Sequence, residues 1–243
     1  MTIVSPHYDD VPLSLGQSLR DGALAATDVR VRVAFGRSNW TNWVHPTRSR
    51  ATPISWWRRI EETVAARSFG YRWTSAGWEE ALLRWGTTGG DRLLDETADL
   101  SDEPLVPEVA AWLQDVAAGG RGERPELVLV PSGLGGHADH RIVALAAARV
   151  AAELPVPVGF YEDRPYVAYL DHDAIEAQLA PLRLDLEVRA VSGPVTAATQ
   201  RRMRRCYPSQ IDRFFVEAME HDLSAGAVER VWFPVGTAPA WFA

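Results

Sequence analysis

Two short polar clusters follow apolar runs and hold residue types that suit catalysis. One lies at residues 5–10, after the run 2–4, and the other at residues 135–140, after the run 127–130. Together they contain the following histidines and aspartates: His7, Asp9, Asp10, His137, Asp139 and His140. In α/β proteins, ligands bind beyond the carboxyl ends of the strands. Two such clusters can meet in space, and together they indicate a hydrolase site for one metal ion.

The residue types suit a borderline metal such as zinc. A catalytic zinc ion usually takes three protein ligands from His, Asp or Glu and keeps one position open for water. His7, Asp10 and His140 form a plausible set, because the spacing of the first two lets both side chains reach one ion where a strand turns into a helix. His140 begins a helix that holds its imidazole at the same edge of the sheet. These donors are also compatible with other divalent transition metals.

Further groups have roles beside the metal. Asp9 could accept a proton from water whose pKa the ion has lowered to about 7. His137, paired with Asp139 as an orienting carboxylate, would be an imidazolium that stabilises an oxyanion or protonates a leaving amine. Activated water, a carboxylate base and an acidic imidazole are the parts that amide hydrolysis needs.

Each cluster has a structural interpretation when it is taken alone. Two aspartates before a helix are typical of an N-cap and of an acid that the helix dipole favours, and two histidines three positions apart arise by chance. Their joint occurrence favours function, because each cluster follows an expected strand and opens an expected helix. The other histidines lack such a carboxylate pattern and are expected at the surface: His45, His172 and His221.

The composition excludes several classes of protein. The 243 residues are 47% hydrophobic, enough for a substantial core without disulfides or a structural metal. The single cysteine, Cys206, rules out an internal disulfide and fits a reducing compartment. No apolar run reaches the roughly 20 residues that cross a bilayer, and the N-terminus does not resemble a signal peptide. We therefore expect a cytoplasmic protein with no membrane span.

The charge indicates which partners to expect. A net charge of −7 argues against nucleic acid, whose phosphates require clustered basic residues. The basic stretch at residues 201–205 is expected on a solvated helix face, with contact to an anionic substrate as the alternative. The expected partner is a small-molecule N-acylated substrate, and the sequence is also compatible with a homo-oligomer.

Strand-like and helix-like patterns alternate along the chain. Apolar, β-rich runs predict strands at residues 2–4, 29–35, 127–131, 156–161 and 184–191. Helical patterns lie at residues 11–20, 54–69, 104–117, 140–152, 171–180, 196–206 and 209–223, and an apolar segment follows at 228–235. This alternation predicts an α/β fold with a Rossmann-like, mostly parallel sheet and helices on both faces. We expect one domain over residues 1–243, because the glycines at 119–122 are typical of a loop rather than a boundary.

Tryptophans concentrate in the least regular part of the chain. Seven of the ten fall within residues 38–99. Trp56 and Trp57 lie on an expected helix and are expected to pack in the core. Trp40 and Trp43 follow a strand end in a polar loop, where their rings could line a cleft and contact a sugar or an acyl group.

The two clusters resemble the hallmark motifs of the PIG-L type (LmbE-like) zinc-dependent N-acetylglucosaminyl de-N-acetylases. Pro-His-x-Asp-Asp matches residues 6–10, and His-x-Asp-His matches residues 137–140. Residues 58–70 are similar to the Arg-x-x-Glu helix of the family, which ends in an aliphatic-Gly pair. Residues 161–166 and 207–210 are similar to the Tyr-Glu-Asp-x-Pro-Tyr and Tyr-x-Ser-Gln segments of a bacterial branch. The similarity therefore extends over most of the chain.

The resemblance implies a Rossmann-like fold and hydrolysis of an N-acetyl or other N-acyl amide, often on an amino sugar. By position it implies that zinc binds to His7, Asp10 and His140. It also implies that Asp9 is the general base and that His137 assists the oxyanion.

The resemblance further implies candidate substrate contacts. Arg59 is one, with a helix-surface ion pair to Glu62 as the alternative, and Tyr166 in the similar segment is another. Gly135 stands where some thiol-sugar deacetylases carry a tyrosine, so the sequence departs from that substrate subclass.

Three functions therefore remain open. The leading hypothesis is a zinc-dependent hydrolase that removes an N-acetyl group from an amino sugar or a sugar-bearing metabolite. The second is an amidase for a peptide, a thiol conjugate or a lipidated natural product. A nucleotide- or sugar-binding module without catalysis is disfavoured, because the turn after the first strand lacks the Gly-x-Gly-x-x-Gly that admits a pyrophosphate.

Overall fold

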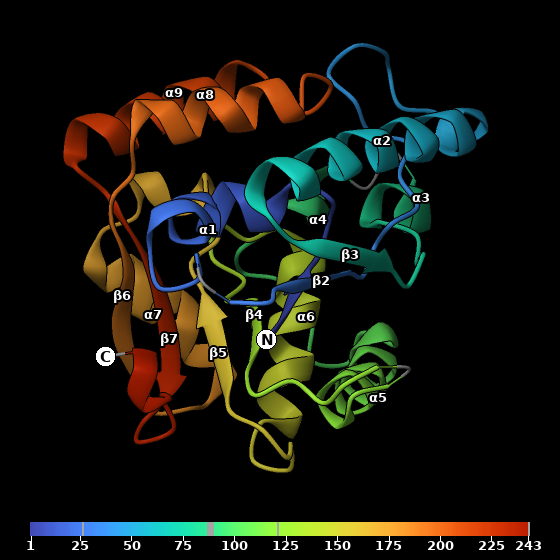
Figure 1. The fold of residues 1–243 in the computed structure, drawn as a ribbon. Helices are drawn as coiled ribbons and strands as arrows, with labels where there is room; N and C mark the ends of the chain where they lie inside the picture. The colour runs from blue at the N-terminus through green and yellow to red at the C-terminus, as the bar shows by residue number, and fades with distance from the viewer. Residues whose placement is uncertain (26, 87–89, 121, 243) are drawn as a thin grey trace.

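One seven-stranded sheet forms the centre of the molecule (Figure 1). The structure is a computed structural model that describes residues 1–25, 27–86, 90–120 and 122–242. The strand order is β3-β2-β1-β4-β5-β7-β6. The strands are β1 (Thr2–Ser5), β2 (Arg30–Val33), β3 (Arg72–Ser75), β4 (Val128–Pro131), β5 (Val158–Tyr161), β6 (Leu186–Pro194) and β7 (Val228–Pro234). Neighbours from β3 to β5 pair in parallel, and β7 is antiparallel to both β5 and β6.

Helices cover both faces of this sheet (Figure 1). They are α1 (Asp10–Asp21), α2 (Ala51–Phe69), α3 (Ala81–Trp85), α4 (Gly90–Leu93), α5 (Leu105–Ala118), α6 (Ala138–Val150), α7 (His172–Leu179), α8 (Ala197–Cys206) and α9 (Arg213–Ala225). Short 3-10 turns occupy Arg48–Arg50, Tyr166–Tyr169, Ala180–Leu182 and Ala240–Phe242. Helices α1, α2, α8 and α9 contribute to one apolar core and α5, α6 and α7 to the other. The predicted α/β fold with a mostly parallel sheet is confirmed.

The central strands β1, β4 and β5 are buried along their whole length and mostly apolar, because helices cover both of their faces. Side chains alternate between the faces of a strand. Ile3 and Leu129 accordingly join the core beneath α1 and α2, whereas Val4 and Val128 join the core beneath α5 and α6. Continuous apolar runs are typical of parallel strands covered on both sides.

The chain changes direction between β1 and β4. From β1 it passes through α1 to β2 on one side, and from β4 through α6 to β5 on the other. The carboxyl ends of these neighbouring strands therefore open into a crevice where the strand order reverses, the usual binding position in open α/β sheets. Both polar clusters of the sequence begin at this edge.

The region between β2 and α5 differs most from expectation. Strand β3 was not predicted, because its sequence, RWTS, has no apolar alternation and it lies at the sheet edge, where its residues are only partly buried. The expectation that Trp56 and Trp57 pack in the core is wrong: their exposed fractions are 63% and 38%. The buried face of α2 instead carries Ile54, Ala65 and Phe69.

Within the described residues, no helix combines the length and apolarity needed to cross a membrane.

Helix α1 is interrupted rather than continuous. Leu15 has φ −132° and ψ 15°, which breaks the helical backbone. The amides of Gln17 and Ser18 then donate to Glu229 Oε1 (2.7 Å) and Oε2 (2.6 Å), from β7. A buried carboxylate from the antiparallel strand therefore satisfies donors that the kink leaves unpaired.

We expect Glu229→Gln to lower the free energy of unfolding by about 1–3 kcal/mol, because an amide has only one acceptor oxygen for two buried N–H groups. Chemical denaturation of the two proteins measures this difference. The exposed Glu217→Gln on α9 is the control and should change stability by less than about 0.5 kcal/mol. Equal stability of wild type and Glu229→Gln would show that Glu229 does not support the kink.

Candidate active site

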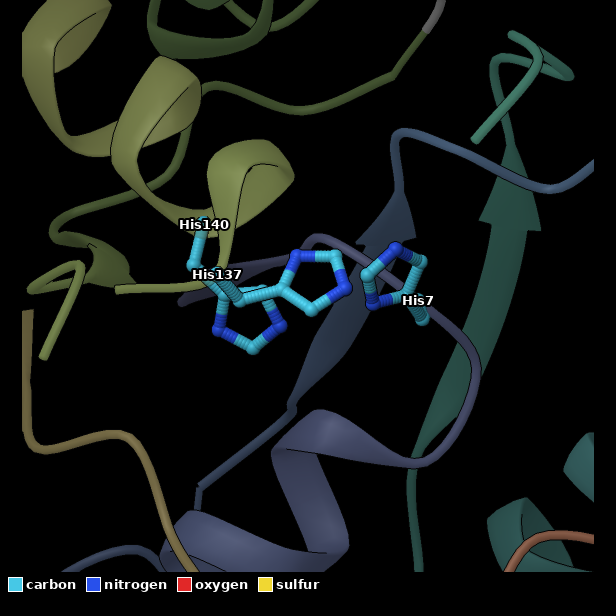
Figure 2. Close-up of side chains that lie close together, drawn as sticks. All are labelled: His7, His137 and His140. Carbon is cyan, nitrogen blue, oxygen red and sulfur yellow. The ribbon is translucent and has the colours of Figure 1, made fainter. Parts of the chain in front are cut away.

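The two polar clusters meet at the crevice between β1 and β4. His7 lies in the turn between β1 and α1, and His137 and His140 lie at the start of α6. Figure 2 shows the three imidazoles converging on one another from these two segments. One ring nitrogen from each lies within 4.8 Å of the others. The fold therefore brings together side chains that are far apart in the sequence.

Asp10 lies between two of these imidazoles. Its Oδ2 atom is 3.3 Å from His7 Nδ1, and its Oδ1 atom is 3.3 Å from His140 Nε2. The His140 Nε2 atom is buried and has no hydrogen-bond partner among the described residues. Imidazole nitrogens and a carboxylate oxygen are the donors that zinc prefers in catalytic sites. His7, Asp10 and His140 thus fit a divalent ion, which would give the buried His140 Nε2 atom the partner that it lacks.

In both His7 and His140, the ring nitrogen that faces away from Asp10 contacts a second carboxylate. His7 Nε2 is 2.9 Å from Asp139 Oδ2, and His140 Nδ1 is 2.7 Å from Asp163 Oδ1. A carboxylate on the far ring nitrogen is typical of a metal-binding histidine, because it fixes the ring and leaves the near nitrogen free to bind. Asp163 follows β5 and is fixed in turn by Ser132 Oγ and by the amides of Gly133 and Leu134. The sequence interpretation did not assign a role to Asp163.

The expected pairing of Asp139 with His137 is wrong. The Asp139 carboxylate contacts His7, and it also accepts from the Ala81 amide at 2.9 Å and from Arg84 at 2.7 Å. His137 is the N-cap of α6, and its Nδ1 accepts from the Asp139 amide at 3.2 Å. The ring of His137 is therefore oriented by backbone rather than by a carboxylate.

The hydrogen bond from the Asp139 amide to Nδ1 also distinguishes His137 from His7 and His140, whose rings are held by carboxylates. Because Nδ1 accepts a hydrogen bond, the proton of the neutral ring is on Nε2, which makes that atom a donor and not a metal ligand. Burial, together with His7 and His140, lowers the pKa of His137 well below its usual 6.5. The neutral ring is thus favoured, where the sequence interpretation expected an imidazolium.

The charges of the cluster are strongly coupled. Burial alone would lower the pKa of His7, but Asp10 and Asp139 outweigh it and raise that pKa to about 9. Burial would raise the pKa of Asp10, yet His140 and His7 lower it well below its ordinary value. Buried carboxylates thus hold positive charge between them, which a proton or a metal ion can supply.

Asp9 lies beside this cluster and is held by Arg58. Arg58 donates to Asp9 Oδ1 at 2.9 Å and to Ser38 Oγ at 2.9 Å, and lies 3.4 Å from Glu80 Oε2. All of these side chains are buried. The guanidinium therefore fixes one oxygen of Asp9 and leaves the other available to the pocket.

Arg58, and not the expected Arg59, faces the site. Arg59 is on the exposed side of α2, with its guanidinium 5.7 Å from the Trp73 ring centroid. The alternative ion pair with Glu62 is also absent, because Glu62 is fully buried and accepts from the hydroxyls of Tyr71 and Tyr207. The buried face of α2 carries Arg58, so helical periodicity was the signal that could have identified it.

Two acids of α2 anchor the segment that closes the pocket. Glu61 accepts from the amide and hydroxyl of Ser209 at 2.9 and 2.6 Å, and Glu62 accepts from Tyr207 at 2.7 Å. The adjacent Gln210 then lines the pocket. The family-like Tyr-x-Ser-Gln segment is therefore held against α2.

The pocket above the cluster has a volume of about 580 Å³. Asp9, Asp10 and His137 contribute polar groups, and apolar side chains form much of its wall. The wall residues are Leu82, Leu93, Leu94, Tyr169, Leu170, Phe214 and Phe215. Of the expected substrate contacts, Trp40 and Tyr166 line the pocket, whereas Trp43 does not and packs against Trp57 with ring centroids 5.4 Å apart.

The close approach of Tyr166 explains why position 135 is a glycine. Gly135 has φ +82°, and a Cβ added there would lie 2.1 Å from the Cβ of Tyr166. A larger residue at Gly135 requires Tyr166 to move. The aromatic ring at this wall therefore comes from the segment after β5.

Fold and site together define the class of the protein: a metal-dependent hydrolase with a Rossmann-like fold. No protein-family model matches the chain. The chain is 30% identical over 212 residues to the 2'-N-acetylparomamine deacetylase of Streptomyces fradiae. The matched region covers 84% of this chain and 70% of that protein. The chain belongs to the LmbE-like (PIG-L) family of zinc-dependent de-N-acetylases, as the sequence motifs predicted.

Solved structures show the same fold. A deacetylase of teicoplanin biosynthesis has a TM-score of 0.67 at 21% identity, with 95% of this chain and 96% of that chain covered. The zinc-inhibited form of teicoplanin deacetylase Orf2 has a TM-score of 0.62 at 19% identity, with 95% and 96% covered. These likenesses extend over nearly the full length of both chains.

We expect Asp163→Asn to weaken zinc binding by about 10- to 100-fold, because the carboxylate behind His140 is lost while the side-chain volume is kept. Competition against a chromogenic chelator measures the affinity. The exposed Asp102→Asn is the control and should bind zinc as wild type does. Unchanged affinity in Asp163→Asn would exclude His140 as a ligand that Asp163 orients.

We expect Glu62→Gln to flatten the pH dependence of stability. Burial raises the pKa of Glu62 from 4.5 to about 8. Between these values the unfolded chain releases a proton that the folded chain keeps, so the free energy of unfolding falls by about 1.4 kcal/mol per pH unit from this group. A glutamine has no proton to lose. Urea denaturation of both proteins at about pH 5 and about pH 8 measures the difference, and parallel losses of stability would contradict it.

Proposed function

We propose that this protein hydrolyses the N-acetyl group of an amino sugar, with a zinc ion held by His7, Asp10 and His140. The observation that carries the proposal is the pair of carboxylate-backed imidazoles whose free nitrogens lie 3.3 Å from Asp10, at a pocket that also contains Asp9. When bound, the ion supplies Lewis acidity that lowers the pKa of a water molecule to about 7. Side chains of the protein transfer the proton and stabilise the oxyanion.

Asp9 is proposed as the general base. Arg58 fixes its Oδ1 atom, which leaves Oδ2 to accept a proton from the attacking water. The oxygen of that water forms a bond to the amide carbon, and the C–N bond then breaks. The proton held by Asp9 passes to the leaving nitrogen, so that acetate and a free amine are released.

His137 is proposed as the oxyanion donor. Its Nδ1 atom accepts from the Asp139 amide, so its Nε2–H is free to donate into the pocket that it lines. Negative charge grows on the carbonyl oxygen as the water adds, and a preorganised donor stabilises that charge. Asp139 acts through His7 and is therefore a positioning residue.

The proposed substrate is an N-acetylated amino sugar of a natural product. The identity to the paromamine-directed deacetylase supports this class. Trp40 and Tyr166 line the pocket and offer ring surfaces for a sugar. A cytoplasmic location is part of the proposal, because Cys206 is a free buried thiol, as expected for a reducing compartment.

The apolar wall favours a second candidate, an amidase for a lipidated natural product. Leu82, Leu93 and Leu94 form an apolar wall of the kind that would hold a long acyl chain. A series of N-acyl glucosamines separates the two functions. Rates that fall from acetyl to octanoyl support the deacetylase, and rates that rise with chain length support the amidase.

We expect Asp9→Asn to lower kcat by about 10²- to 10⁴-fold, because the asparagine keeps an acceptor for Arg58 but cannot take a proton. Acetate release measures activity, and metal analysis of the same sample should show zinc bound as in wild type. Removal of zinc with a chelator should abolish acetate release, and its return should restore it. Full activity of the Asp9→Asn protein would exclude Asp9 as the base.

A further inference from the structure

Two carboxylates that line the pocket form no ion pair among the described residues. Asp212 is the N-cap of α9 and accepts from the Phe215 amide at 3.2 Å. Glu96 accepts from the amide side chain of Gln178 at 3.0 Å. Among the described residues, neither carboxylate lies within 4.0 Å of a basic nitrogen. The wall of the pocket therefore carries two carboxylates that no basic side chain of the described residues pairs with.

The other carboxylates that line the pocket each have a basic partner. Arg58 is the one arginine among the described lining residues, and it is engaged by Asp9 and Glu80. Asp139 is matched by Arg84 and His7. Among the described carboxylates of the lining, Asp212 and Glu96 are thus the ones without an ion-pair partner.

Aromatic rings accompany Asp212. The Phe214 ring lies 6.3 Å from that of Tyr166 and 6.4 Å from that of Tyr169, and all three line the pocket. Aromatic faces attract cations, and an apolar wall strengthens the attraction between an ammonium group and a carboxylate. A carboxylate that shares a pocket wall with aromatic rings suits an organic cation better than an anion or a neutral sugar.

We propose that the substrate carries a protonated amine in addition to the acetamide that is cleaved, and that Asp212, with the rings of Tyr166, Tyr169 and Phe214, binds this amine. Glu96 adds negative charge to the same pocket. The inference rests on the proposed deacetylase function and deepens it, because it makes the substrate an amine-bearing, cationic sugar. Asp212 is then a specificity-determining residue.

Matched sugars test the charge preference. N-acetylglucosamine is compared with three analogues that carry one amine in place of a hydroxyl, at carbon 3, 4 or 6. Wild type should hydrolyse at least one analogue with a kcat/KM about 5- to 20-fold above that of N-acetylglucosamine, through a lower KM. Added salt should reduce this ratio, because screening weakens exposed charge pairs.

Asp212→Asn isolates the charge. Asparagine caps a helix as well as aspartate does, so α9 keeps its N-cap while the carboxylate charge is lost. The ratio of kcat/KM between the preferred analogue and N-acetylglucosamine should fall to about 1 in this variant. Glu217→Gln, which removes an exposed charge from the same helix, is the matched control and should keep the wild-type ratio.

The outcomes are distinguishable. Hydrolysis of all four sugars without preference, or a preference that survives in Asp212→Asn, overturns the assignment of Asp212 and leaves the deacetylase function standing. Failure of wild type to hydrolyse any of the sugars overturns the proposed function, and the amine site falls with it. Preference lost in Asp212→Asn and kept in Glu217→Gln supports the site.

Discussion

The placement of the Asp10 carboxylate between two buried imidazoles is the constraint on which the rest of the structure depends. Oxygens of Asp10 lie 3.3 Å from His7 Nδ1 and from His140 Nε2, and the second nitrogen is buried without a hydrogen bond. Burying such groups is costly unless a partner satisfies them. A divalent ion bound at this position would supply that partner for all three at once. Asp139 and Asp163 hold the two rings so that their free nitrogens face Asp10.

This arrangement is possible because β1 and β4 are neighbours whose chains leave in opposite directions. The same edge receives α2, whose buried face brings Arg58 to Asp9 and Glu61 to Ser209. Charged groups of this helix are buried only because each meets a fixed partner. The candidate metal ligands, the proposed base Asp9 and the pocket wall are therefore parts of one hydrogen-bonded layer above the sheet.

Sequence patterns predicted the elements whose signals are local. An apolar run that ends in a polar cluster identified β1 and β4, and with them His7, Asp10 and His140. Partners across the fold were not accessible in this way. Arg58-x-x-Glu61 and Arg59-x-x-Glu62 have the same spacing, and only the buried face of α2 distinguishes them. Asp163 reaches His140 because β4 and β5 pair, and the exposure of Trp56 depends on which side of α2 packs on the sheet.

The most direct test of the account is an anomalous-scattering map of the zinc-loaded crystal at the zinc absorption edge. The proposed metal site predicts one strong peak bonded to His7 Nδ1, to a carboxylate oxygen of Asp10 and to His140 Nε2, with Asp9 and His137 beside it but not bound. A peak bonded to His137 in place of Asp10, or zinc bound elsewhere while these three side chains point apart, would contradict it.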